Sequence, residues 1–135
     1  MTLSSLEIPS NNLKELSKYS AGILSFVTKV IISRPRPIYA LIDFPDKYSF
    51  PSGHTLTSFV FYIMLYYLIA RTVKDKSLNI ILGIFLLLLI LLIAFSRLYL
   101  GVHYFSDIIG GLVLGTLLVL MNINIIKRNY VNKLK

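Results

Sequence analysis

Residues 78–96 read LNIILGIFLLLLILLIAFS and carry no charged side chain over 19 consecutive positions. A helix of this length extends about 28 Å at roughly 1.5 Å per residue, close to the ~30 Å hydrocarbon core of a bilayer. A run this long predicts a transmembrane helix. We therefore expect the rest of the chain to fold in or against a membrane.

The composition agrees with a membrane protein. Of the 135 residues, 56% are hydrophobic and 15% are charged, and the mean hydropathy is +0.73. Soluble domains carry about a quarter charged residues. The chain has no cysteine, which excludes disulfides and thiolate metal ligands. We expect one membrane-embedded domain over residues 1–135.

The formal net charge of +8 does not indicate a nucleic-acid partner. The basic residues stand at the ends of apolar runs, where such charges set the orientation of a membrane protein. The sequence therefore predicts a bilayer partner and no nucleic acid.

Two further runs also predict membrane spans. Residues 55–70 (TLTSFVFYIMLYYLIA) are uncharged, and residues 108–126 (IIGGLVLGTLLVLMNINII) form a third span. In the latter, Gly111 and Gly115 are four residues apart and offer a smooth face for close helix packing. With residues 78–96, these runs make three predicted crossings.

A fourth segment, residues 12–33, predicts a crossing less directly. It has charges near its start and Lys29 near its end, and its clean apolar run covers only residues 19–28. We prefer a crossing helix with Lys29 turned inward, and an interfacial helix is the alternative. The following loop, residues 34–50, contains three prolines and is not expected to be helical throughout. Its aromatic residues, Phe44 among them, suit headgroup depth.

Four crossings distribute the basic residues unequally between the two faces. Five lie on the face that holds the segment 34–54 and the start of the last helix: Lys29, Arg34, Arg36, Lys47 and Arg97. Nine lie on the other: Lys14, Lys18, Arg71, Lys74, Lys76, Lys127, Arg128, Lys133 and Lys135. The face with nine is predicted to be cytoplasmic, so the other looks outward or into a lumen.

The unusual polar residues gather on that non-cytoplasmic face. Ionisable groups at the edge of a span are costly and tend to face a protein interior or a cavity. Lysine and arginine donors suit the oxygens of a phosphate, and the backbone N–H groups of Ser52, Gly53 and His54 precede a helix, where an anion is favoured. The complete set is Lys29, Arg34, Arg36, Ser52, His54, Arg97, His103 and Asp107.

Two histidines add the remaining chemistry. A neutral imidazole can attack phosphorus and form a covalent intermediate. Asp107 follows His103 by four residues on the same helical face, so it can hold the other ring N–H and set the tautomer. The second histidine, His54, can give a proton to the leaving oxygen.

Three spaced motifs now carry a family resemblance. Residues 29–37 (KVIISRPRP) match K-x6-R-P, residues 51–54 match P-S-G-H, and residues 96–107 (SRLYLGVHYFSD) match S-R-x5-H-x3-D. In this order they resemble the type-2 phosphatidic acid phosphatase superfamily, which also contains vanadium haloperoxidases and glucose-6-phosphatase. The resemblance covers about residues 25–125, with the core motifs at 29–107.

The resemblance implies roles for the matching residues. His103 is the implied nucleophile, Asp107 its orienting partner and His54 the general acid. The implied phosphate-binding residues are Lys29, Arg36, Ser52, Gly53 and Arg97. The resemblance to the phosphatase members implies no metal and no other cofactor for this chain. The carboxylates on the active face (Asp43, Asp46 and Asp107) are also poor material for a magnesium or zinc site. Arg34 and Lys47 fall outside the motifs and are interpreted as flanking or headgroup contacts.

The chain departs from the family in one respect. Integral-membrane members usually have six helices, and this chain aligns from about the third. We therefore expect an all-α membrane helical bundle of about four transmembrane helices, lacking the first two of six. The alternatives are a minimal form, a fragment, a mis-started gene model, or a chain packed against a second copy or a partner.

The sequence favours an integral-membrane lipid phosphatase that works through a phosphohistidine on His103. Its implied substrates are phosphatidic acid, phosphatidylglycerol phosphate or a polyprenyl diphosphate. An inactive, lipid-phosphate-binding or partner-dependent protein is the alternative from another class. A vanadate haloperoxidase is disfavoured, because those relatives are soluble and residues 78–96 are not suited to a soluble protein.

Overall fold

The structure, a computed structural model, describes residues 10–43 and 47–133. Four helices account for most of these residues: α1 (Ser10–Ile32), α2 (Gly53–Thr72), α3 (Lys76–Tyr99) and α4 (Phe105–Lys133). The described ranges contain no β-strand, only an isolated bridge between Pro35 and Tyr48. The predicted all-α helical bundle is confirmed. Phe44, Asp46 and Lys135, named above, lie outside the described residues.

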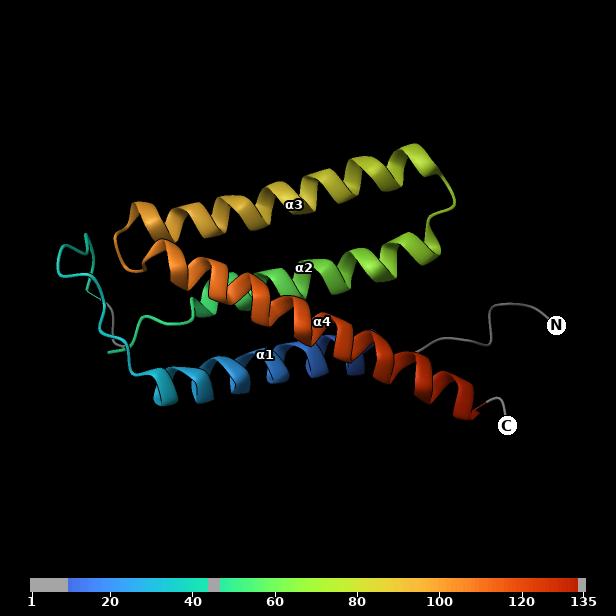
Figure 1. Ribbon diagram of the computed structural model, residues 1–135. Helices are drawn as coiled ribbons and strands as arrows, with labels where there is room; N and C mark the ends of the chain where they lie inside the picture. The colour runs from blue at the N-terminus through green and yellow to red at the C-terminus, as the bar shows by residue number, and fades with distance from the viewer. Residues whose placement is uncertain (1–9, 44–46, 134–135) are drawn as a thin grey trace.

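Helix α2 is the centre of the bundle. It packs against each of the other three helices, with α3 along one side and α1 along the other, while α4 crosses it obliquely (Figure 1). A buried cluster joins α1, α2 and α4, with Leu56, Val60 and Met64 of α2 packed near Ala21 and Leu118. A second row of buried side chains on α3, Leu86, Ile90 and Ala94, faces the bundle.

Three helices are long and apolar enough to cross a bilayer, namely Gly53–Thr72, Lys76–Tyr99 and Phe105–Arg128. They contain the three runs that the sequence predicted as spans. Large apolar side chains point outward from them, as at Ile80, Leu88 and Leu92 of α3, where hydrocarbon would cover them. In α1 the apolar part is shorter and covers Tyr19–Ile32, so the fourth crossing stays a prediction.

The two glycines on α4 pack as their spacing predicted. A Cβ atom placed on Gly111 would lie 3.1 Å from the Ser52 carbonyl oxygen, and one on Gly115 would lie 2.8 Å from Cδ1 of Phe59. The absence of side chains therefore lets α4 approach the first turns of α2. This close approach brings the start of α4 beside the segment PSGH.

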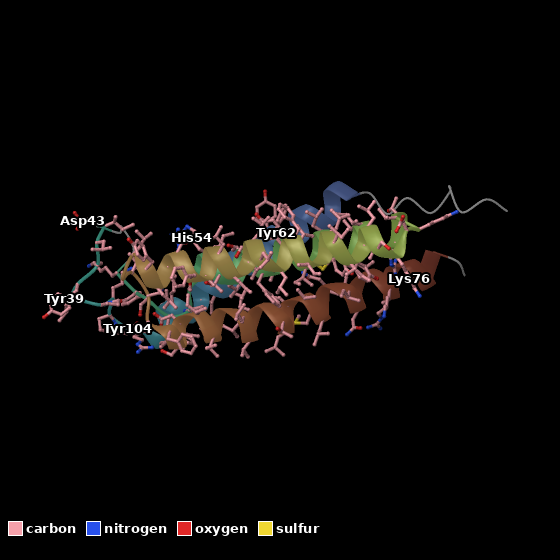
Figure 2. All side chains as sticks on the ribbon, turned by 90° about the horizontal axis from the view of Figure 1, so that it is seen from above. Tyr39, Asp43, His54, Tyr62, Lys76 and Tyr104 are labelled. Carbon is pink, nitrogen blue, oxygen red and sulfur yellow. The ribbon has the colours of Figure 1, made fainter. Side chains whose placement is uncertain are left out.

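The loops that carry the polar motifs meet at one end of the bundle. Tyr39, Asp43, His54 and Tyr104 lie together at that end, whereas Lys76 at the start of α3 lies at the opposite end (Figure 2). The opposite turn is closed by Asp75, whose Oδ1 accepts from the backbone N–H groups of Ser77 (2.8 Å) and Leu78 (3.1 Å). The candidate site is thus confined to a single end of the bundle.

Candidate active site

The segment after α1 turns sharply and runs back past the start of α2. Ser33 has a positive φ of 48°, a left-handed conformation that ends the helix. The carbonyl oxygen of Arg34 then accepts from the backbone N–H of Ser49 at 2.8 Å, and the hydroxyl of Ser49 donates to the Pro35 oxygen at 3.1 Å. Ser49 is fully buried. These bonds place residues 34–37 (RPRP) beside residues 48–52, which lead into α2.

Ser52 ends this segment as the N-cap of α2. Its hydroxyl oxygen accepts from the Oγ1 of Thr55 at 3.0 Å and lies 3.5 Å from the Thr55 nitrogen. Its own backbone N–H donates to the Asp107 carbonyl oxygen at 3.0 Å. Ser52 is completely buried and joins α2 to α4, and Gly53 and His54 follow it in the first turn of α2.

The turn between α3 and α4 presents His103. Gly101 has a positive φ of 66°, and a Cβ atom there would lie 3.0 Å from the Tyr39 carbonyl oxygen. The backbone N–H of Leu41 donates to the Leu100 oxygen at 3.0 Å. Glycine at 101 therefore permits both the turn and the close approach of the loop from α1.

His103 lies between a carboxylate and a guanidinium. Its Nδ1 is 3.4 Å from Oδ2 of Asp107, and its Nε2 is 3.4 Å from Nη1 of Arg36. An arginine N–H can only donate, so this contact favours an unprotonated Nε2 and a hydrogen on Nδ1. The Nδ1 separation is long for a hydrogen bond, and Nδ1 makes no hydrogen bond to any described residue, so Asp107 is its nearest polar neighbour on that side. The arrangement favours the tautomer whose free nitrogen faces Arg36.

Burial keeps the His103 ring neutral. Its side chain is 1% exposed, and this burial is the main cause that lowers its pKa from 6.5 to about 4. The positive charges of Arg36 and, less strongly, Lys29 lower the pKa further, while Asp107 opposes them. At neutral pH the imidazole is therefore uncharged, as a nucleophile must be.

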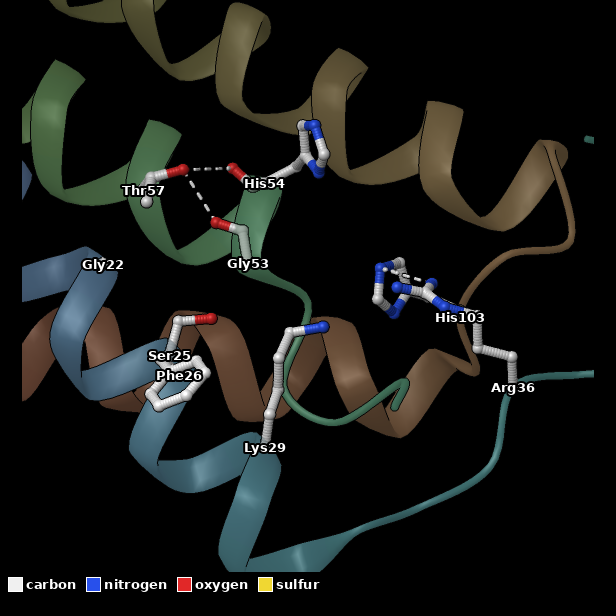
Figure 3. A pocket seen from close by; sticks show the side chains of 9 residues that line it. All are labelled: Gly22, Ser25, Phe26, Lys29, Arg36, Gly53, His54, Thr57 and His103. Carbon is white, nitrogen blue, oxygen red and sulfur yellow. Dashed lines mark hydrogen bonds between the residues drawn. The ribbon is translucent and has the colours of Figure 1, made fainter. Parts of the chain in front are cut away.

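A cavity of about 310 Å³ opens in front of His103. Figure 3 shows His103, Arg36 and Lys29 around it, with His54 on the far side. The Lys29 ammonium donates to the Tyr48 carbonyl oxygen at 2.9 Å, which carries it toward the loop. The complete lining consists of Gly22, Ser25, Phe26, Lys29, Arg36, Gly53, His54, Thr57 and His103.

The structure brings together most of the residues that the sequence selected. Lys29, Arg36, Gly53, His54 and His103 all line the cavity. Two others, Ser52 and Asp107, are fully buried and support the lining residues from behind. The exception is the arginine at position 97 of α3, which is not part of the lining and donates its Nε to the Ser96 hydroxyl at 3.1 Å.

One residue of the site was interpreted as a flanking charge. Nη1 of Arg34 donates to Oδ1 of Asp107 at 3.0 Å and to the Ser106 hydroxyl at 2.6 Å. The sequence holds a signal for the common direction of Arg34 and Arg36, but none for the turn that brings them to α4. Prolines at alternate positions favour an extended chain, in which residues two apart point the same way. Arg34 and Arg36 therefore reach the same neighbouring turn.

The charged residues of the site are mostly cationic. Within residues 10–43 and 47–133, no three His, Asp or Glu side chains gather so that they could hold a metal ion. Asp107 is shared between Arg34 and His103. The arrangement can thus hold a multiply charged anion against a neutral histidine.

Comparison with known proteins identifies relatives over most of the chain. The PAP2 superfamily matches residues 16–130. Phosphatidylglycerophosphatase B of Bacillus subtilis is 35% identical over 101 residues, which cover 71% of this chain and 48% of that protein. Lipid phosphate phosphatase delta of Arabidopsis thaliana is 36% identical over 103 residues, 67% of this chain and 25% of that protein.

A further relative and a crystal structure extend the match. Undecaprenyl-diphosphatase of Sulfolobus acidocaldarius is 29% identical over 121 residues, 85% of this chain and 54% of that protein. The transmembrane PAP2-type phosphatidylglycerolphosphate phosphatase of Bacillus subtilis superposes with a TM-score of 0.76 at 30% identity, covering 86% of this chain and 58% of that one.

The chain spans about half the length, or less, of the curated relatives that it matches. Its three long apolar helices and its likeness to a transmembrane structure show an integral-membrane protein. The superfamily match extends over nearly the whole chain and includes all three motifs. The chain therefore belongs to the PAP2 superfamily.

Proposed function

We propose that this protein is an integral-membrane lipid phosphatase that hydrolyses a phosphomonoester or diphosphate lipid through a phosphohistidine on His103. One observation carries the proposal: a buried, neutral imidazole lines a cationic cavity with its free nitrogen beside Arg36. A cavity that holds anions beside a nucleophile is suited to phosphoryl transfer.

In the first step the Nε2 lone pair attacks phosphorus, and the bond from phosphorus to the lipid oxygen breaks. When the phosphate binds, Arg36 turns its N–H groups toward the phosphate oxygens and releases Nε2. The ring then carries a positive charge, and Asp107 stabilises it through Nδ1–H. This accounts for a carboxylate that is completely buried beside the ring.

His54 serves the leaving group. It lies at the start of α2 and lines the same cavity as His103 (Figure 3), and as an imidazolium it gives its proton to the departing lipid oxygen. In the second step a water attacks phosphorus, the P–N bond breaks, and the neutral His54 takes a proton from that water. Inorganic phosphate leaves and both histidines regain their first states.

The cationic wall stabilises the charge that spreads over the phosphate oxygens. Lys29 approaches from α1, Arg36 from the loop, and the Gly53 N–H from the start of α2. Arg97 would join them from the last turn of α3 after its side chain turns from Ser96. No step in this scheme needs a metal ion, and we therefore propose metal-independent hydrolysis.

The relatives suggest the class of substrate. Their names specify phosphatidylglycerol phosphate, lipid phosphates and undecaprenyl diphosphate. All three classes present a terminal phosphate group on a lipid. The residues of the cavity recognise that shared group, so phosphatidic acid, phosphatidylglycerol phosphate and polyprenyl diphosphate are the substrates to test.

The lipid tail has a route out of the cavity along α1. A Cβ atom on Gly22 would meet no heavy atom within 4 Å, and the side chain of Phe26 is 69% exposed. Both residues line the cavity on the side away from the RPRP loop. We infer that the tail passes between them into the bilayer while the phosphate stays beside His103.

The test is phosphate release by the purified protein in detergent. The three lipids are assayed with and without EDTA, for the wild type, His103→Ala and the surface control Asp43→Asn. Release is expected to survive EDTA and to fall by about 10³-fold or more in His103→Ala. Acid quenching of a reaction with labelled lipid should also trap an acid-labile phosphohistidine, absent from that variant.

Other outcomes would select a rival. Phosphate release that persists in His103→Ala would contradict the phosphohistidine. A folded wild type that binds the lipids without releasing phosphate would favour an inactive or partner-dependent protein. Native mass spectrometry would then test whether the chain pairs with a second copy. Halide oxidation after addition of vanadate and peroxide would favour a haloperoxidase.

A further inference from the structure

Arg34 contacts the site from behind, without lining the cavity. It lies two residues before Arg36, yet only Arg36 is part of the lining. The Arg34 guanidinium instead reaches the first turn of α4 and donates to Asp107 and Ser106. Whatever Arg34 contributes to catalysis must pass through another residue.

The two oxygens of Asp107 have separate partners. Oδ1 accepts from Arg34 at 3.0 Å. Oδ2 accepts from the backbone N–H of Tyr104 at 2.9 Å and faces Nδ1 of His103 at 3.4 Å. A carboxylate held on both oxygens cannot rotate about its terminal bond. The oxygen that faces the imidazole is therefore held by the Tyr104 N–H directly, and Arg34 fixes the rotation of the carboxylate through the other oxygen.

Arg34 is itself firmly held. Its carbonyl oxygen accepts from Ser49 at 2.8 Å, and its guanidinium carbon lies 4.1 Å from the centre of the Tyr104 ring. Stacking of this kind orients a guanidinium. Backbone and side chain are thus both fixed before any substrate arrives, which suits a residue that sets geometry.

We propose that Arg34 is a positioning residue for catalysis, which holds the Asp107 carboxylate so that Oδ2 receives the Nδ1–H of His103 and Nε2 stays free to attack. The inference rests on the proposed phosphohistidine mechanism for its kinetic consequence. Its structural consequence, the tautomer of His103, does not depend on turnover.

The kinetic test compares Arg34→Ala, Arg34→Lys and Ser106→Ala with the wild type on phosphatidic acid. In Arg34→Ala we expect kcat to fall about 10- to 100-fold, because a small misplacement of a reacting group slows the chemical step. KM should stay within about two-fold of the wild-type value. Arg34→Lys should recover part of kcat, because an ammonium can still donate to Oδ1. Ser106→Ala removes an exposed acceptor of the same guanidinium and should stay within about two-fold of wild type.

The second measurement is histidine-selective ¹⁵N NMR in detergent micelles. The chain has two histidines, so a spectrum of His54→Gln assigns them. In the wild type His103 should show the Nδ1–H tautomer, and in Arg34→Ala a mixture with Nε2–H. Far-UV circular dichroism of each variant checks that the helices are intact.

The outcomes separate the two proposals. An unchanged kcat with an unchanged tautomer in Arg34→Ala would overturn the positioning role, as would a rise in KM alone, which would mark a headgroup contact. A wild type that releases no phosphate, with a tautomer that shifts in Arg34→Ala, would support the positioning role and contradict the proposed function.

Discussion

The backbone N–H of Ser52 donates to the carbonyl oxygen of Asp107 over 3.0 Å and joins the first turns of α2 and α4. The Asp107 side chain meanwhile accepts from Arg34, at the start of the loop after α1. One residue of the third motif therefore contacts the segments that carry the other two. The relative positions of the three motifs depend on Asp107 as much as on helix packing.

The ionisation of His103 should respond to Arg36. Because the folded-state pKa of about 4 is below the ordinary 6.5, the unfolded chain binds the proton first. The neutral ring thus contributes stability above pH 6.5 that is lost as the pH falls toward 4. Arg36→Gln removes a positive charge and should raise the pKa, while Lys29→Met should raise it less.

An ¹⁵N titration of His103 in micelles measures these shifts directly. The acidic limb of kcat/KM for Arg36→Gln should move to higher pH in parallel. A wild-type pKa at or above the ordinary value, or a downward shift in Arg36→Gln, would contradict the electrostatic account.

Arg97 offers a test of a residue outside the described lining. If it turns into the cavity when phosphate binds, Arg97→Ala should weaken competitive inhibition by inorganic phosphate about 10-fold, in the range of a lost charged hydrogen bond. Inhibition constants for wild type and variant provide the measurement. An unchanged inhibition constant would show that Arg97 does not bind phosphate and only donates a hydrogen bond to the Ser96 hydroxyl.

The packing of α4 on α2 should not tolerate a side chain at Gly111. A methyl group there would press on the Ser52 oxygen at 3.1 Å and the Leu56 nitrogen at 3.3 Å, and backbone atoms cannot move aside easily. Gly111→Ala is expected to cost about 1–3 kcal/mol of stability. Gly22→Ala, where the space is open, is the matched control and should leave stability unchanged or raise it by up to about 1 kcal/mol, because alanine favours a helix more than glycine does.

Thermal unfolding in detergent, followed by far-UV circular dichroism because the chain has no tryptophan, compares the two variants. Equal midpoints for Gly111→Ala and Gly22→Ala would show that the close approach of α4 contributes nothing.

The tail route along α1 predicts selectivity at Gly22. Gly22→Phe fills the apolar side of the cavity and should lower kcat/KM for a long-chain phosphatidic acid about 10-fold, the scale set by apolar pocket contacts. Hydrolysis of tail-free p-nitrophenyl phosphate should be unaffected. Equal losses on both substrates would mean that the bulky side chain disturbs the phosphate site instead.

The orientation of the bundle can be tested with the cysteines that the chain lacks. Asp43 and Lys74 are exposed, and they lie in the loops at opposite ends of the bundle. In intact cells, a membrane-impermeant maleimide should label Asp43→Cys and spare Lys74→Cys, because the more basic end faces the cytoplasm. The reverse labelling would place the active site inside the cell.

The sequence predicted the helices well because each apolar run is long enough to be unambiguous. The segments 55–70, 78–96 and 108–126 all fall within observed helices. The first helix was harder to assign, since charges flank a short apolar stretch, and its crossing is still a prediction. The spacing of Gly111 and Gly115 predicted a face for close helix packing, and the structure shows that α2 is the helix packed there.

Site residues could be predicted from the sequence where they belong to a motif of defined residue types and spacing. Contacts that depend on how the backbone turns between helices could not. Five residues of the lining were chosen by type and spacing, namely Lys29, Arg36, Gly53, His54 and His103. The other four, Gly22, Ser25, Phe26 and Thr57, were not, because helical packing alone brings them to the cavity. The contact between Arg34 and Asp107 spans 73 positions and depends on the turn at Ser33, which no local pattern announces. Likewise, the backbone role of Ser52 depends on how closely α4 approaches.

The ties to Asp107 also bear on mechanics. They hold α2, α4 and the loop after α1 together at one end of the bundle, while at the far end a short turn closed by Asp75 joins α2 to α3. In a thinner or thicker bilayer, helices joined in this way can change tilt by pivoting about the pinned end. The geometry around His103 would then survive a change of membrane, because the strain is taken up at the opposite surface.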